Sequence, residues 1–209
     1  MDPAFWKSRW AEGKIGFHEG KPNSYLERHH DKLAIYPRVL VPMCGKAEDL
    51  AFLAARGHEV VGVELVEDAV KAFFAEHGLV PVVVEHAVFA EYRAPQITIF
   101  VGDVFRAKRD VVGQIDAIWD RAALVALPDD LRRRYVDHLR ALAPARVLCV
   151  TFEYEQSKMA GPPFSVEEGE LRALYDNCEV ELLSEGPDPR TDRGPDAPPC
   201  MERCFSITL

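Results

Sequence analysis

Two apolar segments of this chain each end beside a residue suited to binding a nucleoside. The segment 38–42 (RVLVP) runs into a turn that contains Gly45, and the segment 59–64 (EVVGVE) ends on Glu64, 19 residues after that glycine. Both have the apolar composition of buried parallel strands. In such a sheet the backbone approaches the ligand at the first turn, and an acid on the next strand accepts hydrogen bonds from the ribose hydroxyls. The spacing therefore predicts a nucleoside site.

The glycine pattern narrows the class of nucleoside. A Gly-x-Gly-x-x-Gly run, whose backbone amides would cradle a pyrophosphate, is absent, and Pro42, Met43 and Cys44 precede a single Gly45. This pattern favours a nucleoside ligand without phosphates. S-adenosylmethionine is the commonest ligand of that kind.

Polar residues also follow two further predicted strands, 97–101 and 115–119. Asp103 could meet an adenine amino group, or Gly-Asp could be an ordinary turn. Arg121 could pair with the neighbouring Asp120, or it could present a fixed cation to a cofactor carboxylate or an anionic acceptor. Because ligands of doubly wound sheets bind beyond the carboxyl ends of the strands, we expect these side chains near the site.

Three aromatic residues, Trp6, Trp10 and Phe17, precede the first predicted strand in a charged stretch. Ring faces attract a desolvated cation such as a sulfonium. We expect the segment of about 1–23 to form a lid over the ligand. The alternative is that these rings pack on the flank of the domain.

Strand and helix patterns alternate along the chain, which predicts a three-layer α/β/α sandwich with a mostly parallel seven-stranded sheet. A capping box at Ser24 to Glu27 should open the first of these helices. Residues 80–96 are expected to hold a strand edge and an excursion, and 186–199 a loop. The expected helices are 24–35, 48–56, 67–77, 128–142 and 166–175, and the expected strands are 39–41, 59–64, 97–101, 115–119, 146–152, 179–184 and 203–209.

Composition indicates an ordinary globular enzyme. The 209 residues predict a single domain spanning 1–209. A net charge of -9 argues against a nucleic-acid partner, and the run Arg132-Arg133-Arg134 is expected to lie on a solvated helix face. No apolar run is long enough for a membrane span and no signal peptide is recognisable. Five cysteines without framework spacing fit the cytoplasm, no metal site is predicted, and a monomer is expected.

Motifs along nearly the whole chain resemble thiopurine S-methyltransferase of the bacterial type, a family of class I S-adenosylmethionine-dependent methyltransferases. The matching pieces, in the family's order, are Phe5-Trp6-x3-Trp10, Gly16-Phe17-His18, Pro42-Met43-Cys44-Gly45-Lys46, Gly62-Val63-Glu64, Ile118-Trp119-Asp120-Arg121-x-Ala123-Leu124 and Gly161-Pro162-Pro163-Phe164.

The resemblance implies a class I methyltransferase fold and a set of site residues. It implies cofactor contacts at Trp10, Met43, Glu64 and Arg121, with Trp6 beside them and Asp103-Val104 against the adenine. It also implies that Phe17 and Pro163 border the acceptor pocket. Met43 stands where the family commonly has leucine, a swap that should be tolerated. The loop 186–199 has no match, and its Arg190 or Arg193 is a candidate to close over the acceptor.

The chemistry implied is in-line attack of a sulfur or selenium nucleophile on the activated methyl group, which leaves S-adenosylhomocysteine. Thiopurine and aromatic thiols are largely thiolate near neutral pH, so no general base is assigned. Charge is neutralised as the thiolate meets the sulfonium, so a dry apolar pocket and good positioning should supply the rate. Arg121 would act as an electrostatic stabiliser. His18 is the one candidate for proton transfer, against a histidine with no chemical role. Selenium or tellurium compounds are further possible acceptors.

Two other functions remain open from the residues alone. Tyr154 and Lys158 have the Tyr-x3-Lys spacing of NAD-dependent short-chain oxidoreductases, although Gly161-Pro162-Pro163 should prevent the long helix on which that pair lies. A nucleoside-binding protein without catalysis would need only Glu64 and the first turn. Cys44 could be a reactive thiol activated by a helix, or a small packing residue.

Overall fold

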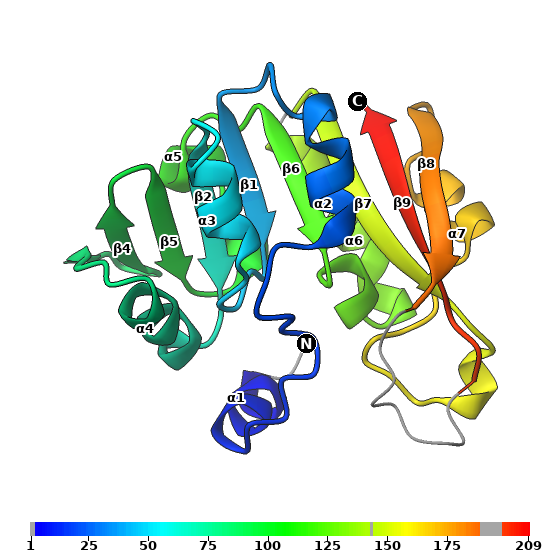
Figure 1. Cartoon of the computed structure of the whole chain (residues 1–209), viewed down its shortest axis with the longest axis horizontal. Coiled ribbons are helices and arrows are strands. Elements are labelled where there is room, and N and C mark those ends of the chain that lie inside the picture. Colours follow the sequence, from blue (N-terminus) through cyan, green and yellow to red (C-terminus); the bar gives the residue numbers. More distant parts are fainter. Residues whose placement is uncertain (1–2, 143, 189–197) are drawn as a thin grey trace.

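The computed structural model describes residues 3–142, 144–188 and 198–209 and contains one nine-stranded sheet, in the order β3-β4-β5-β2-β1-β6-β7-β9-β8 (Figure 1). The five central strands run parallel to one another. They are β5 (Ile97–Val101), β2 (Glu59–Glu64), β1 (Arg38–Pro42), β6 (Ala117–Arg121) and β7 (Arg146–Glu153).

Antiparallel strands extend the sheet at both edges. At one edge β9 (Met201–Thr208) pairs with β7 and with β8 (Glu179–Pro187), and at the other β4 (Ala90–Ala94) pairs with β5 and with β3 (Val82–Glu85). The predicted count of seven strands was wrong because the stretch 80–96 forms this hairpin. All four side chains of β3 are exposed, so the segment lacks the alternation of buried and exposed residues that marks a strand in a sequence.

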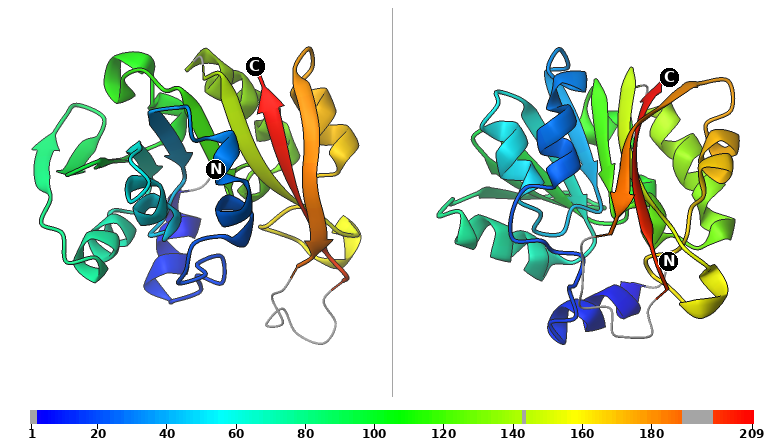
Figure 2. Two further views of the ribbon diagram at one scale, coloured as in Figure 1. Left: turned by 45° about the horizontal axis from the view of Figure 1, so that its top comes forward. Right: turned by 45° about the vertical axis from the view of Figure 1, so that its right-hand side comes forward.

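Helices cover both faces of the sheet, which confirms the three layers (Figure 2). One face carries α2 (Ser24–His29), α3 (Asp49–Ala54) and α4 (Glu67–Glu76), and the other carries α5 (Arg109–Val112), α6 (Asp129–Ala141) and α7 (Glu168–Leu174). Short 3-10 helices are η1 (His30–Lys32), η2 (Val104–Arg106), η3 (Leu124–Ala126) and η4 (Gln156–Lys158). No helix among the described residues is long and apolar enough to cross a membrane.

The central strands are apolar throughout because each is covered on both faces. In β1, Val39 and Val41 pack among the helices of the α3 face, whereas Leu40 packs on the α6 face. Val60 and Val61 divide β2 in the same way. β1 and β2 are therefore packed between two hydrophobic cores, and this packing fixes the position of their carboxyl ends.

Two local predictions at element ends were wrong. The cap of α2 is Asn23 rather than Ser24, since the Asn23 side chain accepts a hydrogen bond from the Tyr25 amide at 3.0 Å. The fourth parallel strand, β6, lies two residues later than expected and includes Asp120 and Arg121. α3 ends at Ala54, two residues before the predicted end, and α4 ends at Glu76; Gly57 and Gly78 follow these helices with positive φ, as predicted for the residues that terminate them.

Arg132 contradicts the prediction of a solvated arginine run. It is only 4% exposed, its Nε donates to the Leu127 carbonyl at 3.0 Å, and its Nη1 pairs with Glu170 at 2.6 Å. Arg133 and Arg134 beside it are exposed. Arg132 therefore ties α6 to the loop before it and to α7, which charge patterning along one helix cannot reveal.

Candidate active site

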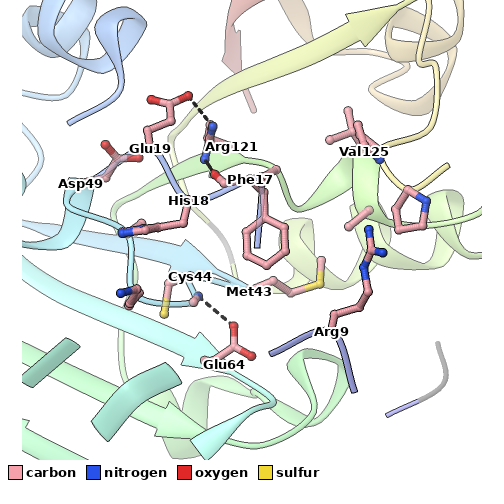
Figure 3. A pocket seen from close by; sticks show the side chains of 18 of the residues that line it. Arg9, Phe17, His18, Glu19, Met43, Cys44, Asp49, Glu64, Arg121 and Val125 are labelled. Atoms are coloured by element: carbon pink, nitrogen blue, oxygen red, sulfur yellow. Dashed lines mark hydrogen bonds and ion pairs between the residues drawn. The ribbon is translucent and has the colours of Figure 1, made fainter. Parts of the chain in front are cut away.

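A pocket opens at the carboxyl ends of β1, β2 and β6, beneath the N-terminal helix α1 (Pro3–Ala11) (Figure 3). No residue of α1 is buried, and the helix lies apart from the layers on the sheet. The pocket brings together seven of the residues predicted for the site: Trp6, Trp10, Phe17, Met43, Glu64, Arg121 and Pro163.

Glu64 joins the first turn to the end of β2. Its side chain accepts hydrogen bonds from the Gly45 amide and the Val66 amide, both at 2.8 Å, and the residue is only 6% exposed. Burial raises the pKa of Glu64, while the backbone hydrogen bonds oppose that rise. The carboxylate is therefore held in one orientation, and each oxygen keeps a further lone pair for a ligand.

The first turn needs left-handed backbone at two positions. Met43 has φ of 48° and Gly45 has φ of 53°. A Cβ added at Gly45 would lie 3.0 Å from the Trp10 ring, so only glycine lets this ring approach the turn without strain. Trp10 also meets Phe17 edge to face, with ring centroids 5.7 Å apart, and Trp6 meets the same ring at 6.0 Å. The aromatic residues of the N-terminal segment thus converge on the turn.

Arg121 is bound to the N-terminal segment rather than to Asp120. It forms an ion pair with Glu19, and its Nη1 donates to the Phe17 carbonyl at 2.5 Å. Its side chain is 8% exposed and its Nε has no partner among the described residues. Sequence reasoning missed Glu19, although it directly follows the aromatic motif at 16–18.

Asp120 is structural. It is fully buried, and it accepts from the Leu124 amide at 3.0 Å and from the Tyr135 hydroxyl at 2.9 Å. Burial raises the pKa of Asp120 to about 6. The residue fixes the turn after β6, which sets the position of Arg121.

A second buried acid, Asp49, was also missed. It accepts from the Asn23 amide at 2.7 Å and from the Trp119 indole at 2.8 Å, and burial raises its pKa. Asn23 in turn donates to Glu19 at 3.3 Å. The chain from Arg121 through Glu19 and Asn23 to Asp49 connects the N-terminal segment with α3. In the sequence, this chain of contacts is marked only by Asp49 in the first turn of a predicted helix. Acids are common at that position, so the sequence could not single it out.

Apolar residues form the opposite wall. Phe17 and Pro163 both line the pocket, and their place beside the acceptor stays a prediction. The Tyr154 hydroxyl donates to the Pro163 carbonyl at 2.6 Å and so holds the proline segment. The remaining apolar lining on this side comes from Val125, Ala126, Phe152, Met159 and Pro162.

Asp103 and Val104 lie outside the pocket lining. The Asp103 side chain caps η2 by accepting from the Phe105 amide at 3.0 Å, and Val104 is buried in the core. Their assignment to the adenine stays a prediction. Arg190 and Arg193, the candidates to close over the acceptor, lie outside the described residues.

His18 lines the pocket, and burial lowers its pKa, so near neutral pH it is mostly uncharged. Cys44 is buried, and burial raises its pKa well above the ordinary value for a thiol. Cys44 also lies where an added Cβ at Gly62 would come within 2.9 Å of its Sγ. Cys44 is therefore a packing residue and not a reactive thiolate.

The Tyr-x3-Lys pair lacks the geometry of a short-chain oxidoreductase. Tyr154 follows β7 and holds Pro163, while Lys158 lies on the 3-10 helix η4 and pairs with Glu155 at 2.7 Å. Since the two residues share no helix and Lys158 already has a carboxylate partner, the lysine does not act on the tyrosine. The oxidoreductase alternative is unsupported.

Solved methyltransferase structures have the same fold. The 1,6-didemethyltoxoflavin-N1-methyltransferase of Burkholderia thailandensis, solved with S-adenosylhomocysteine, matches with a TM-score of 0.64 at 17% identity, over 99% of this chain and 87% of that one. The magnesium protoporphyrin IX methyltransferase of Synechocystis, also solved with S-adenosylhomocysteine, matches with a TM-score of 0.62 at 14% identity, over 99% of both chains. These likenesses confirm the class I methyltransferase fold.

Sequence comparison narrows the family. Residues 1–194 match the family model described as thiopurine S-methyltransferase. The thiopurine S-methyltransferase of Xanthobacter autotrophicus is 50% identical over 84% of both chains. That of Pseudomonas aeruginosa is 48% identical over 89% of this chain and 88% of its own. Together with the pocket that holds the predicted motifs, these matches show that the chain belongs to the thiopurine S-methyltransferase family.

Proposed function

We propose that this protein is an enzyme that transfers a methyl group from S-adenosylmethionine to the sulfur of thiopurines and other aromatic or heterocyclic thiols. The names of the relatives support the reaction, and the structural neighbours that hold S-adenosylhomocysteine support the cofactor. Selenium or tellurium compounds are further acceptors of the same class, since they are also soft nucleophiles.

The pocket fits the cofactor. Glu64 is a buried carboxylate held at the end of β2, where it can accept from ribose hydroxyls. Gly45 leaves room that a Cβ would fill, and Trp6 Nε1 and Arg121 Nε are buried pocket donors without partners among the described residues. We assign Trp6, Trp10, Met43, Glu64 and Arg121 to the cofactor. When bound, S-adenosylmethionine supplies an electrophilic methyl group on a sulfonium.

The chain's own contribution is positioning and exclusion of water. Phe17 and Pro163 would border the acceptor, with the apolar wall behind them. The N-terminal segment of about 1–23 would act as the lid, because its rings pack on the first turn and Arg121 holds its end. A thiol that is already ionised needs no base, so His18 is assigned no proton transfer. Charge neutralisation between thiolate and sulfonium favours such a dry pocket.

We further propose a cytoplasmic monomer that acts as one domain over 1–209 and takes no nucleic-acid partner. All five cysteines are free, as in a reducing compartment, and the net charge of -9 disfavours a polyanion.

The contact between Glu64 and the Gly45 amide carries this proposal, and calorimetric titration with S-adenosylhomocysteine tests it. In Glu64→Gln an amide replaces the carboxylate that faces two backbone donors, so we expect binding to weaken about 10- to 100-fold. Glu59→Gln, at the other end of the same strand, is the control and should bind as the wild type does.

A second assay addresses the transfer itself. Wild-type protein should move labelled methyl from S-adenosylmethionine to thiophenol and to 6-mercaptopurine. Binding of S-adenosylhomocysteine without transfer to any thiol, selenite or tellurite would leave a nucleoside-binding protein and overturn the proposed reaction. No binding at all would overturn the cofactor assignment.

A further inference from the structure

The pocket has a polar side at the start of α3 and an apolar wall that includes Val125 and Pro163, and charged side chains line both. Four acids line it, namely Glu19, Glu48, Asp49 and Glu64, and four cations line it, namely Arg9, Lys21, Lys46 and Arg121. Lys46 pairs with Glu76 at 2.6 Å, and Arg121 pairs with Glu19. Since both of these cations already have carboxylate partners, neither presents an uncompensated charge to an acceptor.

Three of these acids, Glu19, Glu48 and Asp49, lie on the α3 side of the pocket, whereas Glu64 lies at the end of β2 (Figure 3). Glu48 contacts His77 at 3.1 Å, and Asp49 is held by backbone and indole donors. Lys21 is exposed, and it lies between Glu19 and Asn23, whose backbone amide donates to Asp49, so the backbone of this segment runs along the α3 side.

Arg9 differs from Lys46 and Arg121, which are both paired. It lies in the last turn of α1, is half-buried, and lines the pocket without an ion pair among the described residues, although its charge helps to lower the pKa of the exposed Glu12. Its one ring contact is with Phe5, 5.6 Å from the ring centroid. In Figure 3 its guanidinium lies toward Val125, across Phe17 from Glu19 and Asp49. Arg9 therefore presents a cation without an ion pair beside the apolar wall of the pocket.

We propose that Arg9 recognises a carboxylate on the acceptor, so that the preferred substrates are aromatic thiols with an anionic ring substituent. The inference rests on the proposed function, because it specifies the substrate of the same site. A guanidinium binds a carboxylate through two parallel N–H···O hydrogen bonds, and both gain strength in a pocket that excludes water. A neutral ring would use only the apolar wall and leave the charge of Arg9 unpaired.

Methyl transfer to two probes of matched shape tests this role. The probes are thiophenol and whichever isomer of mercaptobenzoate the wild type uses best. We expect Arg9→Gln to lower kcat/KM for mercaptobenzoate about 10- to 100-fold, mainly through KM, and to change thiophenol less than about 3-fold. Arg9→Lys should recover part of the loss, because lysine restores the positive charge but cannot form the two parallel hydrogen bonds of a guanidinium. Lys7→Gln, exposed on the same helix and outside the pocket lining, should leave both probes unchanged.

Binding provides a readout that does not depend on turnover. With S-adenosylhomocysteine present, calorimetry should show mercaptobenzoate binding to wild type and binding weakened about 10-fold or more in Arg9→Gln. If Arg9→Gln loses activity equally with both probes, Arg9 supports the helix or the thiolate rather than the carboxylate. If Arg9→Gln and the wild type have the same rates with both probes, Arg9 has no role in acceptor binding. Either result overturns the proposal. Failure of the wild type to methylate either thiol would instead contradict the proposed function.

Discussion

The guanidinium of Arg121, the last residue of β6, is paired with the carboxylate of Glu19 in the N-terminal segment. The same guanidinium donates to the Phe17 carbonyl, so one side chain of the sheet holds the backbone of the N-terminal segment that carries the aromatic residues.

Replacing Glu19 by glutamine should loosen the N-terminal segment. The change removes the charge that compensates a nearly buried Arg121, and we expect a loss of about 1–3 kcal/mol from the free energy of unfolding. Hydrogen exchange of the amides in residues 3–22 should become faster. Glu12→Gln, at an exposed acid of the same segment, is the control. Unchanged exchange in Glu19→Gln would mean that the ring contacts and the Arg121–Phe17 hydrogen bond hold the segment without this ion pair.

Asp120 should make stability depend on pH. Burial raises its pKa from 3.8 to about 6, so the folded chain keeps a proton that the unfolded chain loses. Stability from this group is fully present below about pH 4 and is lost as pH rises through about 6, by about 3 kcal/mol.

The substitution Asp120→Asn should remove the decrease in stability that Asp120 causes as the pH rises. Urea unfolding at about pH 4.5 and pH 7.5 measures it: relative to the wild type, the variant should gain stability at the higher pH. Asp110→Asn, at an exposed carboxylate of α5, controls for the loss of one negative charge. A constant difference between Asp120→Asn and wild type would show that Asp120 is ionised throughout.

Arg132 should matter far more for stability than its neighbours in the run. In Arg132→Gln the Leu127 carbonyl and Glu170 lose their partner, and we expect a loss of about 2–4 kcal/mol. Arg134→Gln, which removes only an exposed contact with the Phe105 ring, should cost less than about 1 kcal/mol. Chemical unfolding of both variants measures the two losses in free energy of unfolding. Similar losses would mean that the buried contacts of Arg132 do not stabilise the fold more than the exposed contact of Arg134 does.

Gly13 and Gly45 both have left-handed backbone, but only Gly45 lies against another side chain, so alanine substitutions at the two positions distinguish backbone strain from steric crowding. Gly13→Ala should cost about 1 kcal/mol, since φ is +67° but the space around its Cβ is empty. Gly45→Ala carries the same backbone strain and also brings a methyl group to 3.0 Å from Trp10. We expect a shift in tryptophan fluorescence and weaker binding of S-adenosylhomocysteine in Gly45→Ala alone. Identical fluorescence in the two variants would show that Trp10 does not rest on the turn.

The sequence by itself determined the parallel strands and the first turn. Segments such as 59–64 and 97–101 are apolar because they are covered on both faces, and this local pattern is visible in a sequence. Gly45 and Glu64 were identifiable for the same reason, because their spacing follows from one strand-turn-helix-strand unit. The edge hairpin was missed because the side chains of β3 are exposed and carry no alternation.

Only the tertiary structure decided how charges pair. Arg121 has Asp120 beside it in the sequence, yet it pairs with Glu19, 102 residues away, because successive side chains of β6 point to opposite faces. Burial of Arg132 likewise depends on α7, and the place of Arg9 in the pocket depends on how α1 lies over the sheet. Periodicity reports how one element is covered, whereas charge compensation depends on elements that are distant along the chain and meet only when folded.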